Sequence, residues 1–455
     1  MRRSTGTALL AWLTMAGVAC AQPVPLSDIK FTDRRLANGL RVLLVEDHSA
    51  PTVAISIGYH VGGKDDPPGR SGFAHLFEHL MFKGTANTKP ETLDRLTEDV
   101  GGFNNAFTNE DVTNYFEVVP SNYLQTLLWA EADRLKSLNV DQKNFKTERQ
   151  VVIGEYDQRV LAQPYGRLSQ LIDSQVYRVH PYGRGVIGNP GELNAASLAD
   201  VQRFHRTYYQ PDNATLVVVG DFDPRQANAW VDRYFGSIPK SPRPIPRVTK
   251  AEPPQKSERR TTYYGENVPL PAVAFVWRAV AESSPDAAAL QVLENILSEG
   301  ESSRLYRSLV YEKQAATDVS AEADLREQPG LFAMYAILNA GRSPTEVEQL
   351  LDAEVRRVQS TPVSAEELEK ARTQLVSSLV REREENLDRA VELVLATIRQ
   401  GDPKKVNTTL AELQAVTAAD VQRVARTYLV PTARTVIYYL PKSMQKAPKA
   451  APKKP

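Results

Sequence analysis

An internal repeat constrains the fold of this chain more than any other feature. The run Asp200-Val201-Gln202-Arg203 recurs 220 residues later as Asp420-Val421-Gln422-Arg423. Further identities occur at the same offset on both sides of this run. They are Arg206-Thr207-Tyr208 with Arg426-Thr427-Tyr428, Pro211 with Pro431, Pro51 with Pro271, and Val53-Ala54 with Val273-Ala274. So many matches at one offset indicate the duplication of a unit of domain size.

The duplication divides the chain into two halves. At 455 residues the chain is also too long for one ordinary hydrophobic core. We expect an N-terminal half over residues 22–237 and a C-terminal half over residues 261–440. Residues 238–260 hold six prolines among polar side chains and predict an extended linker. The Lys-, Pro- and Ala-rich residues 441–455 predict a disordered tail.

Strand and helix patterns follow each other irregularly within the first half. Residues 39–45 and 53–59 predict strands, and residues 105–119 predict a hairpin about Asn109-Glu110-Asp111. Helices are expected over residues 73–82, 123–135 and 148–161. Hairpin-paired strands with helices gathered on one side favour an α+β fold, with a mixed or antiparallel sheet in each half.

The first 21 residues predict an export signal. Arg2 and Arg3 precede an apolar run over residues 8–19, which is too short to span a bilayer as a helix. Ala19-Cys20-Ala21 follows as a small-x-small cleavage site, so we expect a periplasmic mature chain that starts near Gln22 and has no transmembrane segment. A buried N-terminal helix, a lipid anchor at Cys20 and full secretion are the alternatives.

Charge and cysteine usage narrow the possible chemistry. Lys+Arg and Asp+Glu both number 55, which gives no basic excess for nucleic acid or an anionic membrane surface. Cys20 is the only cysteine. A chain cut after Ala21 would have no disulfide framework and no thiolate ligand, so a metal would have to be bound by histidines and carboxylates.

The run His75-Leu76-Phe77-Glu78-His79 has the spacing of a metal site. Two histidines four residues apart lie on one face of a helix and can bind one Zn²⁺. Glu78, beside the second histidine, can hold the bound water, in the inverted order of the His-Glu-x-x-His helix. Two ordinary helical histidines are the alternative, disfavoured because the chain has only 6 histidines.

Zinc also needs a third protein ligand and an open position for water. Glu155 is the candidate, on a helix expected to begin near Glu148. Glu148 lies two turns earlier on the same face. We expect it to accept a hydrogen bond from a ligating imidazole.

The residues around these positions resemble the signature of the pitrilysin and mitochondrial processing peptidase family, a group of inverted zincins. The matching segments are Gly69-Arg70-Ser71-Gly72-Phe73-Ala74-His75-Leu76-Phe77-Glu78-His79-Leu80-Met81-Phe82-Lys83-Gly84-Thr85 and Glu148-Arg149-Gln150-Val151-Val152-Ile153-Gly154-Glu155. Weaker landmarks are Gly101-Gly102, Asn105-Ala106, His180-Pro181-Tyr182 and Gly220-Asp221. The resemblance covers nearly the whole chain, including the duplication.

The resemblance implies a zinc-dependent endopeptidase with one Zn²⁺ per chain and two α+β halves that face each other across a chamber. The implied roles are metal ligation by His75, His79 and Glu155, general base catalysis by Glu78, and support of the site by Glu148. Extended peptides or unfolded segments would bind along a strand edge at Asn105 and Ala106. An ordinary hairpin is the alternative interpretation of that segment.

The second half would be a silent copy. Asn295 and Glu299 stand at the positions of His75 and His79 under the 220-residue offset. In relatives with complete active sites the silent half supplies an Arg and a Tyr, whereas the matching positions here are Val310 and Thr317. We therefore expect a dimer with a related chain that carries this pair but lacks the metal motif. A homodimer is the alternative assembly, and a non-catalytic partner or structural subunit is the alternative function.

Overall fold

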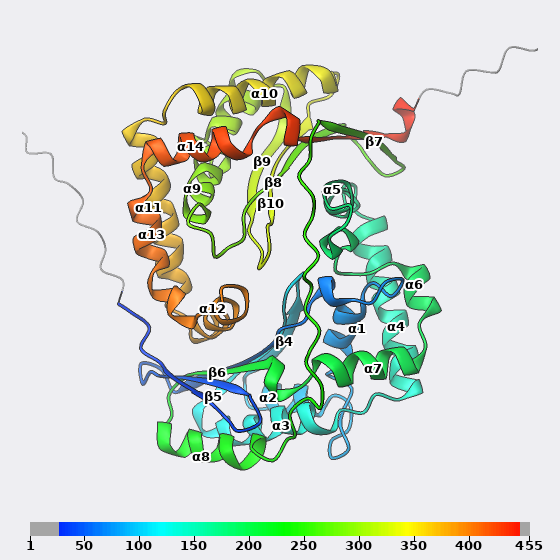
Figure 1. Cartoon of the computed structure of the whole chain (residues 1–455), viewed down its shortest axis with the longest axis vertical. Helices are drawn as coiled ribbons and strands as arrows, with labels where there is room; N and C mark the ends of the chain where they lie inside the picture. Colours follow the sequence, from blue (N-terminus) through cyan, green and yellow to red (C-terminus); the bar gives the residue numbers. More distant parts are fainter. Residues whose placement is uncertain (1–26, 446–455) are drawn as a thin grey trace, which may run out of the picture.

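Two β-sheets, one from each half of the chain, form the frame of the molecule (Figure 1). The structure is a computed structural model that describes residues 27–445. The first sheet has the strand order β1-β2-β6-β3-β5-β4. Its strands are β1 (Thr32–Arg35), β2 (Arg41–Glu46), β3 (Thr52–Tyr59), β4 (Phe103–Thr108), β5 (Thr113–Pro120) and β6 (Ala214–Gly220).

The second sheet repeats this plan without a counterpart of β1. Its order is β7-β11-β8-β10-β9. The strands are β7 (Arg259–Gly265), β8 (Ala272–Arg278), β9 (Ala316–Asp324), β10 (Leu331–Leu338) and β11 (Thr435–Pro441). The β2–β6 and β7–β11 pairs are parallel, and the other pairs in both sheets are antiparallel. The predicted α+β class with two related halves is confirmed.

The helices follow the duplication as closely as the strands do. The first half contains α1 (Phe73–Leu80), α2 (Thr92–Glu98), α3 (Leu124–Ser137), α4 (Gln142–Tyr156), α5 (Leu168–Val176), α6 (Pro190–Ala195), α7 (Leu198–Tyr208) and α8 (Pro224–Phe235). The second half contains α9 (Ala287–Ser298), α10 (Pro344–Ser360), α11 (Ala365–Glu382), α12 (Asn386–Arg399), α13 (Thr409–Ala415) and α14 (Ala418–Tyr428). Helices α7 and α14 begin with the same capping box, Ser197 with Asp200 and Thr417 with Asp420.

The two halves exchange one helix each. Apart from α5 and α12, helices of each half cover one face of that half's own sheet. The other face of the first sheet packs against α12, whose Leu393 and Val394 meet Leu43 and Val217. The other face of the second sheet packs against α5 and the turn that follows it. The reciprocal exchange buries apolar surface of each half in the other, so the halves form one unit.

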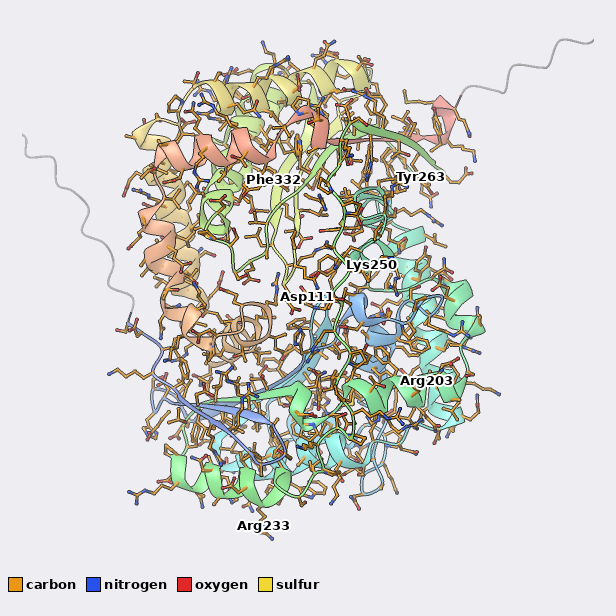
Figure 2. The ribbon with its side chains drawn as sticks, viewed as in Figure 1. Asp111, Arg203, Arg233, Lys250, Tyr263 and Phe332 are labelled. Atoms are coloured by element: carbon orange, nitrogen blue, oxygen red, sulfur yellow. The ribbon has the colours of Figure 1, made fainter. Side chains whose placement is uncertain are left out.

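Buried charges also connect the halves. Asp111, in the turn between β4 and β5, lies where the halves meet (Figure 2) and is 1% exposed. It accepts hydrogen bonds from Lys64 Nζ (2.8 Å), Tyr182 Oη (2.6 Å) and the main-chain nitrogen of Glu327 (2.9 Å) in the second half. The Lys64 ammonium also pairs with the Glu327 carboxylate. A loop of the second half thereby anchors the strand turn of the first.

Most sequence predictions of elements hold, with one shifted boundary. The predicted strands over residues 39–45 and 53–59 are β2 and β3, and the predicted hairpin is β4–β5. The helix predicted over residues 148–161 instead begins at Gln142, because Asp141 caps it by accepting from the main-chain nitrogen of Asn144. At Asp157 it changes to a π-helical turn, Asp157–Leu161.

Two predictions fall partly or wholly outside the described residues. The export signal over residues 1–21 lies outside them, as do residues 446–455 of the predicted tail. The start of that tail is ordered, contrary to the prediction, because Pro441 ends β11 and Lys442–Met444 form a 3-10 helix. Within residues 27–445, no helix has the length and apolar character needed to cross a membrane. The proline-rich residues 239–258 run between the halves without helix or strand and are held partly by Arg247, whose guanidinium donates to the main-chain oxygen of His60 (2.8 Å).

Candidate metal centre

Helix α1 has an apolar face and a second face that contains the two candidate metal-binding histidines. Leu76, Phe77 and Leu80 are buried in the core of the first half. The 3.6-residue period therefore directs His75 and His79 together to the other side of the helix. Their ring centroids lie 4.9 Å apart. The expected helix thus brings both histidines to one side, as the four-residue spacing requires.

Helix α4 packs against α1 and brings the predicted carboxylate to the histidines. Glu155 Oε2 lies 3.6 Å from His75 Nε2 and 3.2 Å from His79 Nε2. One potential ligand atom from each of the three residues lies within 4.8 Å of the others. No other group of three such residues comes together in the part of the chain that the structure describes.

The donor set fits a zinc ion. Two atoms that each bind a tetrahedral Zn²⁺ at ~2.0–2.1 Å lie about 3.4 Å apart. The two nitrogen-to-oxygen distances of 3.6 and 3.2 Å bracket that separation. Two imidazoles and one carboxylate are also a donor set that zinc favours in hydrolytic sites. Burial, followed by the effect of His79, lowers the pKa of His75 to about 4, so its lone pair is free at neutral pH.

Two cations that the sequence analysis did not single out contact the carboxylates of the site. Arg159 Nη1 lies 2.8 Å from Glu155 Oε1, which leaves Oε2 to face the histidines. Lys83 Nζ lies 3.2 Å from Glu148 Oε1. Arg159 follows Glu155 by four residues, so helical i, i+4 spacing was the signal that could have identified it. Lys83 lies beyond the end of α1 and meets Glu148 of α4 only through the fold, so spacing along the chain could not have identified it.

Glu148 reaches the expected side of His79 without forming the expected hydrogen bond. Its Oε2 lies 3.8 Å from His79 Nδ1, the ring nitrogen opposite the one that faces Glu155. That separation is longer than a hydrogen bond. The carboxylate is only 3% exposed, so it supplies a buried negative charge behind the imidazole.

Glu78 is half-buried beside the two histidines. Burial raises the pKa of its carboxyl above the usual value, an effect that the Thr108 hydroxyl and the His79 imidazole partly oppose. A carboxylate with a raised pKa is a better proton acceptor than a solvated one. At Glu155 the contact with the His79 imidazole outweighs burial, so the pKa of the Glu155 carboxyl lies below its usual value. The two glutamates thus differ in the way that a base and a ligand should differ.

The predicted substrate segment lies at a sheet edge. Strand β4 is the last strand of the first sheet and contacts α1. Asn105 is exposed and Ala106 is half-buried on this strand. The main-chain nitrogen of Ala106 donates to the Asn105 side-chain oxygen (2.8 Å) and not to another strand. Phe103, at the start of β4, is 49% exposed. An extended peptide could therefore add to this edge by main-chain hydrogen bonds.

Two other histidines lie apart from this cluster. His180 Nε2 is 2.9 Å from Gln328 Oε1, which joins the first half to the second. His205 stacks against Phe77 and against Tyr209, two rings that also contact each other. The contacts of both residues suit a structural role.

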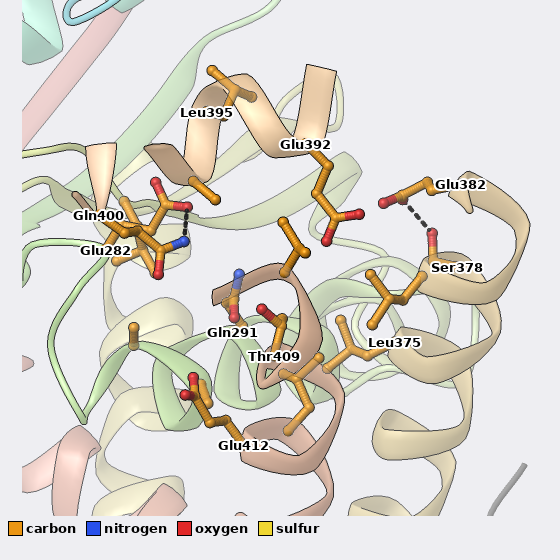
Figure 3. Close-up of a pocket in the computed structure, with 17 residues that line it drawn as sticks. Glu282, Gln291, Leu375, Ser378, Glu382, Glu392, Leu395, Gln400, Thr409 and Glu412 are labelled. Atoms are coloured by element: carbon orange, nitrogen blue, oxygen red, sulfur yellow. Dashed lines mark hydrogen bonds between the residues drawn. The ribbon is translucent and has the colours of Figure 1, made fainter. Parts of the chain in front are cut away.

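A separate cavity in the second half contains none of the predicted site residues (Figure 3). It has a volume of about 300 Å³ and lies among α9, α11, α12 and α13. Carboxylates on its wall come from Glu282, Glu382, Glu392 and Glu412. The Glu282 carboxylate accepts from Gln400, and the Glu382 carboxylate accepts from Ser378. The metal centre and this cavity are therefore distinct features of different halves.

Models of one peptidase family match most of the chain. The model described as insulinase (peptidase family M16) matches residues 41–190. The model described as peptidase M16 inactive domain matches residues 195–375. The first match contains the three candidate ligands, and the second contains the positions of Asn295 and Glu299.

Relatives and solved structures with related names extend over both halves. A zinc protease named PqqE from Helicobacter pylori is 29% identical over 408 residues, which is 89% of this chain and 92% of that protein. A probable mitochondrial-processing peptidase subunit beta from Arabidopsis thaliana is 24% identical and is covered to 75%.

Among solved structures, a protease from Helicobacter pylori superposes with a TM-score of 0.87 and 28% identity, covering 90% of this chain and 100% of that one. The periplasmic protease PqqL from Escherichia coli shares the fold with a TM-score of 0.72 and 17% identity. This match covers 92% of the present chain and 48% of PqqL.

Proposed function

Since the chain belongs to peptidase family M16, we propose that it is a zinc-dependent endopeptidase with one metal site, formed by His75, His79 and Glu155. The observation that carries the proposal is the convergence of these side chains from α1 and α4, with Glu155 Oε2 at 3.6 and 3.2 Å from the two Nε2 atoms. The zinc proteases among its relatives support the choice of metal.

Glu78 is the proposed general base. When bound, zinc polarises a scissile carbonyl and lowers the pKa of water. Glu78 accepts the proton of the attacking water and then gives it to the leaving nitrogen. Its raised pKa favours both transfers, because the carboxyl can hold the proton between them. No covalent intermediate with the protein is needed.

The proposed substrates are extended peptides and unfolded segments. The free edge of β4 offers the main-chain groups around Asn105 and Ala106, and Asn105 must release the Ala106 N–H to a substrate carbonyl. Recognition through main-chain groups selects for extended conformation more than for sequence.

A second chain is proposed to complete the active enzyme. The chain corresponds to about half of PqqL in the structural match. Thr317, at one position where relatives supply an oxyanion donor, is exposed and donates to the main-chain oxygen of Ile337 (3.3 Å). Val310, at the other position, has no side-chain donor. The preferred partner is a homologous chain with an Arg and Tyr pair, and a second copy of this chain is the alternative.

We place the protein outside the cytoplasm, in the periplasm. The signal-like residues 1–21 support this location, as does the periplasmic protease with the same fold. A lipid anchor at Cys20 and secretion remain the other outcomes. Cell fractionation followed by N-terminal sequencing of the mature chain would distinguish them: a chain that starts near Gln22 supports cleavage after Ala21.

The direct test of catalysis is the Glu78→Gln variant. It should retain zinc and lose peptide hydrolysis by ~10²–10⁴-fold, because the variant keeps the ligands and removes the base. The readout is cleavage of a quenched fluorescent peptide, with metal content measured on the same sample. The matched control is Glu98→Gln at the surface end of α2, which should leave both quantities unchanged. A Glu78→Gln protein with the native rate contradicts the assignment.

A further inference from the structure

The start of α1 lacks a cap of its own. Gly72 precedes the helix with a left-handed backbone, φ 88°, and has no side chain to accept from the first free N–H groups. A Cβ at this position would come within 2.8 Å of the Cα of Gly188, so glycine is required by both conformation and space. An eight-residue helix has little stability of its own and depends on such contacts.

A carboxylate from the preceding loop takes over this task. Asp66 Oδ2 accepts from the main-chain nitrogen of Gly72 (2.5 Å), and Asp66 Oδ1 accepts from that of Ala74 (2.9 Å). Ala74 is the residue immediately before His75. Asp66 is only 2% exposed, so its position is determined by packing and not by solvent. The carboxylate therefore binds the turn of the helix from which the first histidine projects.

The loop that carries Asp66 is itself held from several sides. The Arg184 guanidinium donates to the main-chain oxygen of Asp66. Lys64, two residues earlier, pairs with Asp111 and with Glu327 of the second half. Burial raises the pKa of Asp66, and its hydrogen bonds from Ala74 and Gly72 oppose that rise. Both oxygens face N–H donors, an arrangement that suits the ionised carboxylate.

We propose that Asp66 is a positioning residue for the metal centre, and that it sets the place of α1 so that His75 and His79 face Glu155. This inference rests on the proposed zinc site. Asp66 touches neither a candidate ligand atom nor a reacting atom. It acts through the main chain of α1, in the way that residues behind a metal site orient its ligands.

The test is zinc affinity of Asp66→Asn, with the visible spectrum of the Co²⁺-loaded protein as a second readout. The amide keeps the size of the side chain but directs an N–H₂ group at helix N–H donors. We expect zinc affinity to fall ~10–100-fold and the cobalt bands to shift. Val231→Ala in α8 is the control for lost stability, because Val231 is fully buried on a helix that packs mainly on α3. Asp223→Ala, at the cap of α8, is the control for a lost cap.

Each outcome decides the matter. Native zinc affinity and an unchanged cobalt spectrum in a folded Asp66→Asn protein overturn the inference and leave the proposed function intact. A wild-type protein that binds no zinc overturns the proposed function and the inference together. If Asp66→Asn does not fold, Asp66→Glu replaces it, since it keeps the charge but moves the carboxylate by one methylene. A shifted spectrum then supports the inference, and a native one refutes it.

Discussion

Helices α1 and α4 in the first half and helices α9 and α11 in the second occupy equivalent places in the two copies of one fold. The first pair brings two imidazoles and a carboxylate together. In the second pair the positions of His75 and His79 hold Asn295 and Glu299. The positions of Glu148 and Glu155 hold Leu368 and Leu375, both packed in the core of the second half. The frame is thus retained where the ligands are absent.

The difference indicates that the fold of each half does not depend on the metal ligands. Leu368 and Leu375 add apolar contacts where the first half has carboxylates that must be desolvated. The second half therefore contributes through packing contacts with the first. Helix α12 covers the first sheet, and the loop of the second half that contains Glu327 supports the segment that leads to α1. The comparison predicts large chemical effects in the first half and only structural effects in the second.

The largest effect is expected from Glu155→Ala. Loss of a direct ligand should reduce zinc affinity by more than the ~10–100-fold expected for Glu148→Ala, whose carboxylate lies only behind His79. Zinc titration against a competing chelator measures both. A more severe loss in Glu148→Ala would show that the two roles are reversed.

The next effect concerns the missing oxyanion donors. Addition of a homologous chain that carries the Arg and Tyr pair should raise peptidase activity by ~10²–10³-fold, the usual effect of one such donor. The measurement compares the isolated chain with the mixture at equal zinc occupancy. Full activity of the isolated chain, unchanged by any partner, would refute the need for a second chain.

A smaller effect is expected where the halves meet. Although burial opposes it, His60 and Lys64 lower the pKa of Glu327 to about 2. Glu327→Gln should lower the free energy of unfolding by about 1–3 kcal/mol at neutral pH. Because the folded pKa lies below the unfolded value of ~4.3, this contribution is complete above pH ~4.3 and is lost as the pH falls toward 2.

Denaturant unfolding at several pH values checks this expectation. The control is Glu346→Gln, which removes the exposed partner of Arg342 and should cost well under ~1 kcal/mol. Equal losses in the two variants, or a Glu327→Gln difference that grows as the pH falls, would contradict the account of this contact.

The smallest effect is expected from Glu299→Ala. Glu299 stands where His79 stands in the other copy, but we expect zinc affinity and turnover to change less than ~2-fold, since no group of potential metal ligands forms around it within residues 27–445. The same chelator titration applies. A clear loss of zinc in this variant would mean that the second half takes part in metal binding.

The sequence predicts the features that depend on local spacing. The 220-residue offset anticipates the paired helices α7 and α14, and the four-residue spacing of His75 and His79 anticipates their common face. The sequence could not predict that α5 and α12 each pack on the sheet of the other half. Both faces of each sheet are apolar, and an apolar face does not show which half will cover it. Asp66 was missed for a similar reason: its partners are main-chain groups, which leave no pattern of side chains.

Metal analysis of the wild-type protein beside His79→Ala tests the central claim most directly. The account predicts about one zinc per chain in the wild type, almost none in His79→Ala, and one in Glu299→Ala. Zinc retained by His79→Ala at the wild-type level, or two zinc ions per wild-type chain, would contradict the assignment of a single site to the first half.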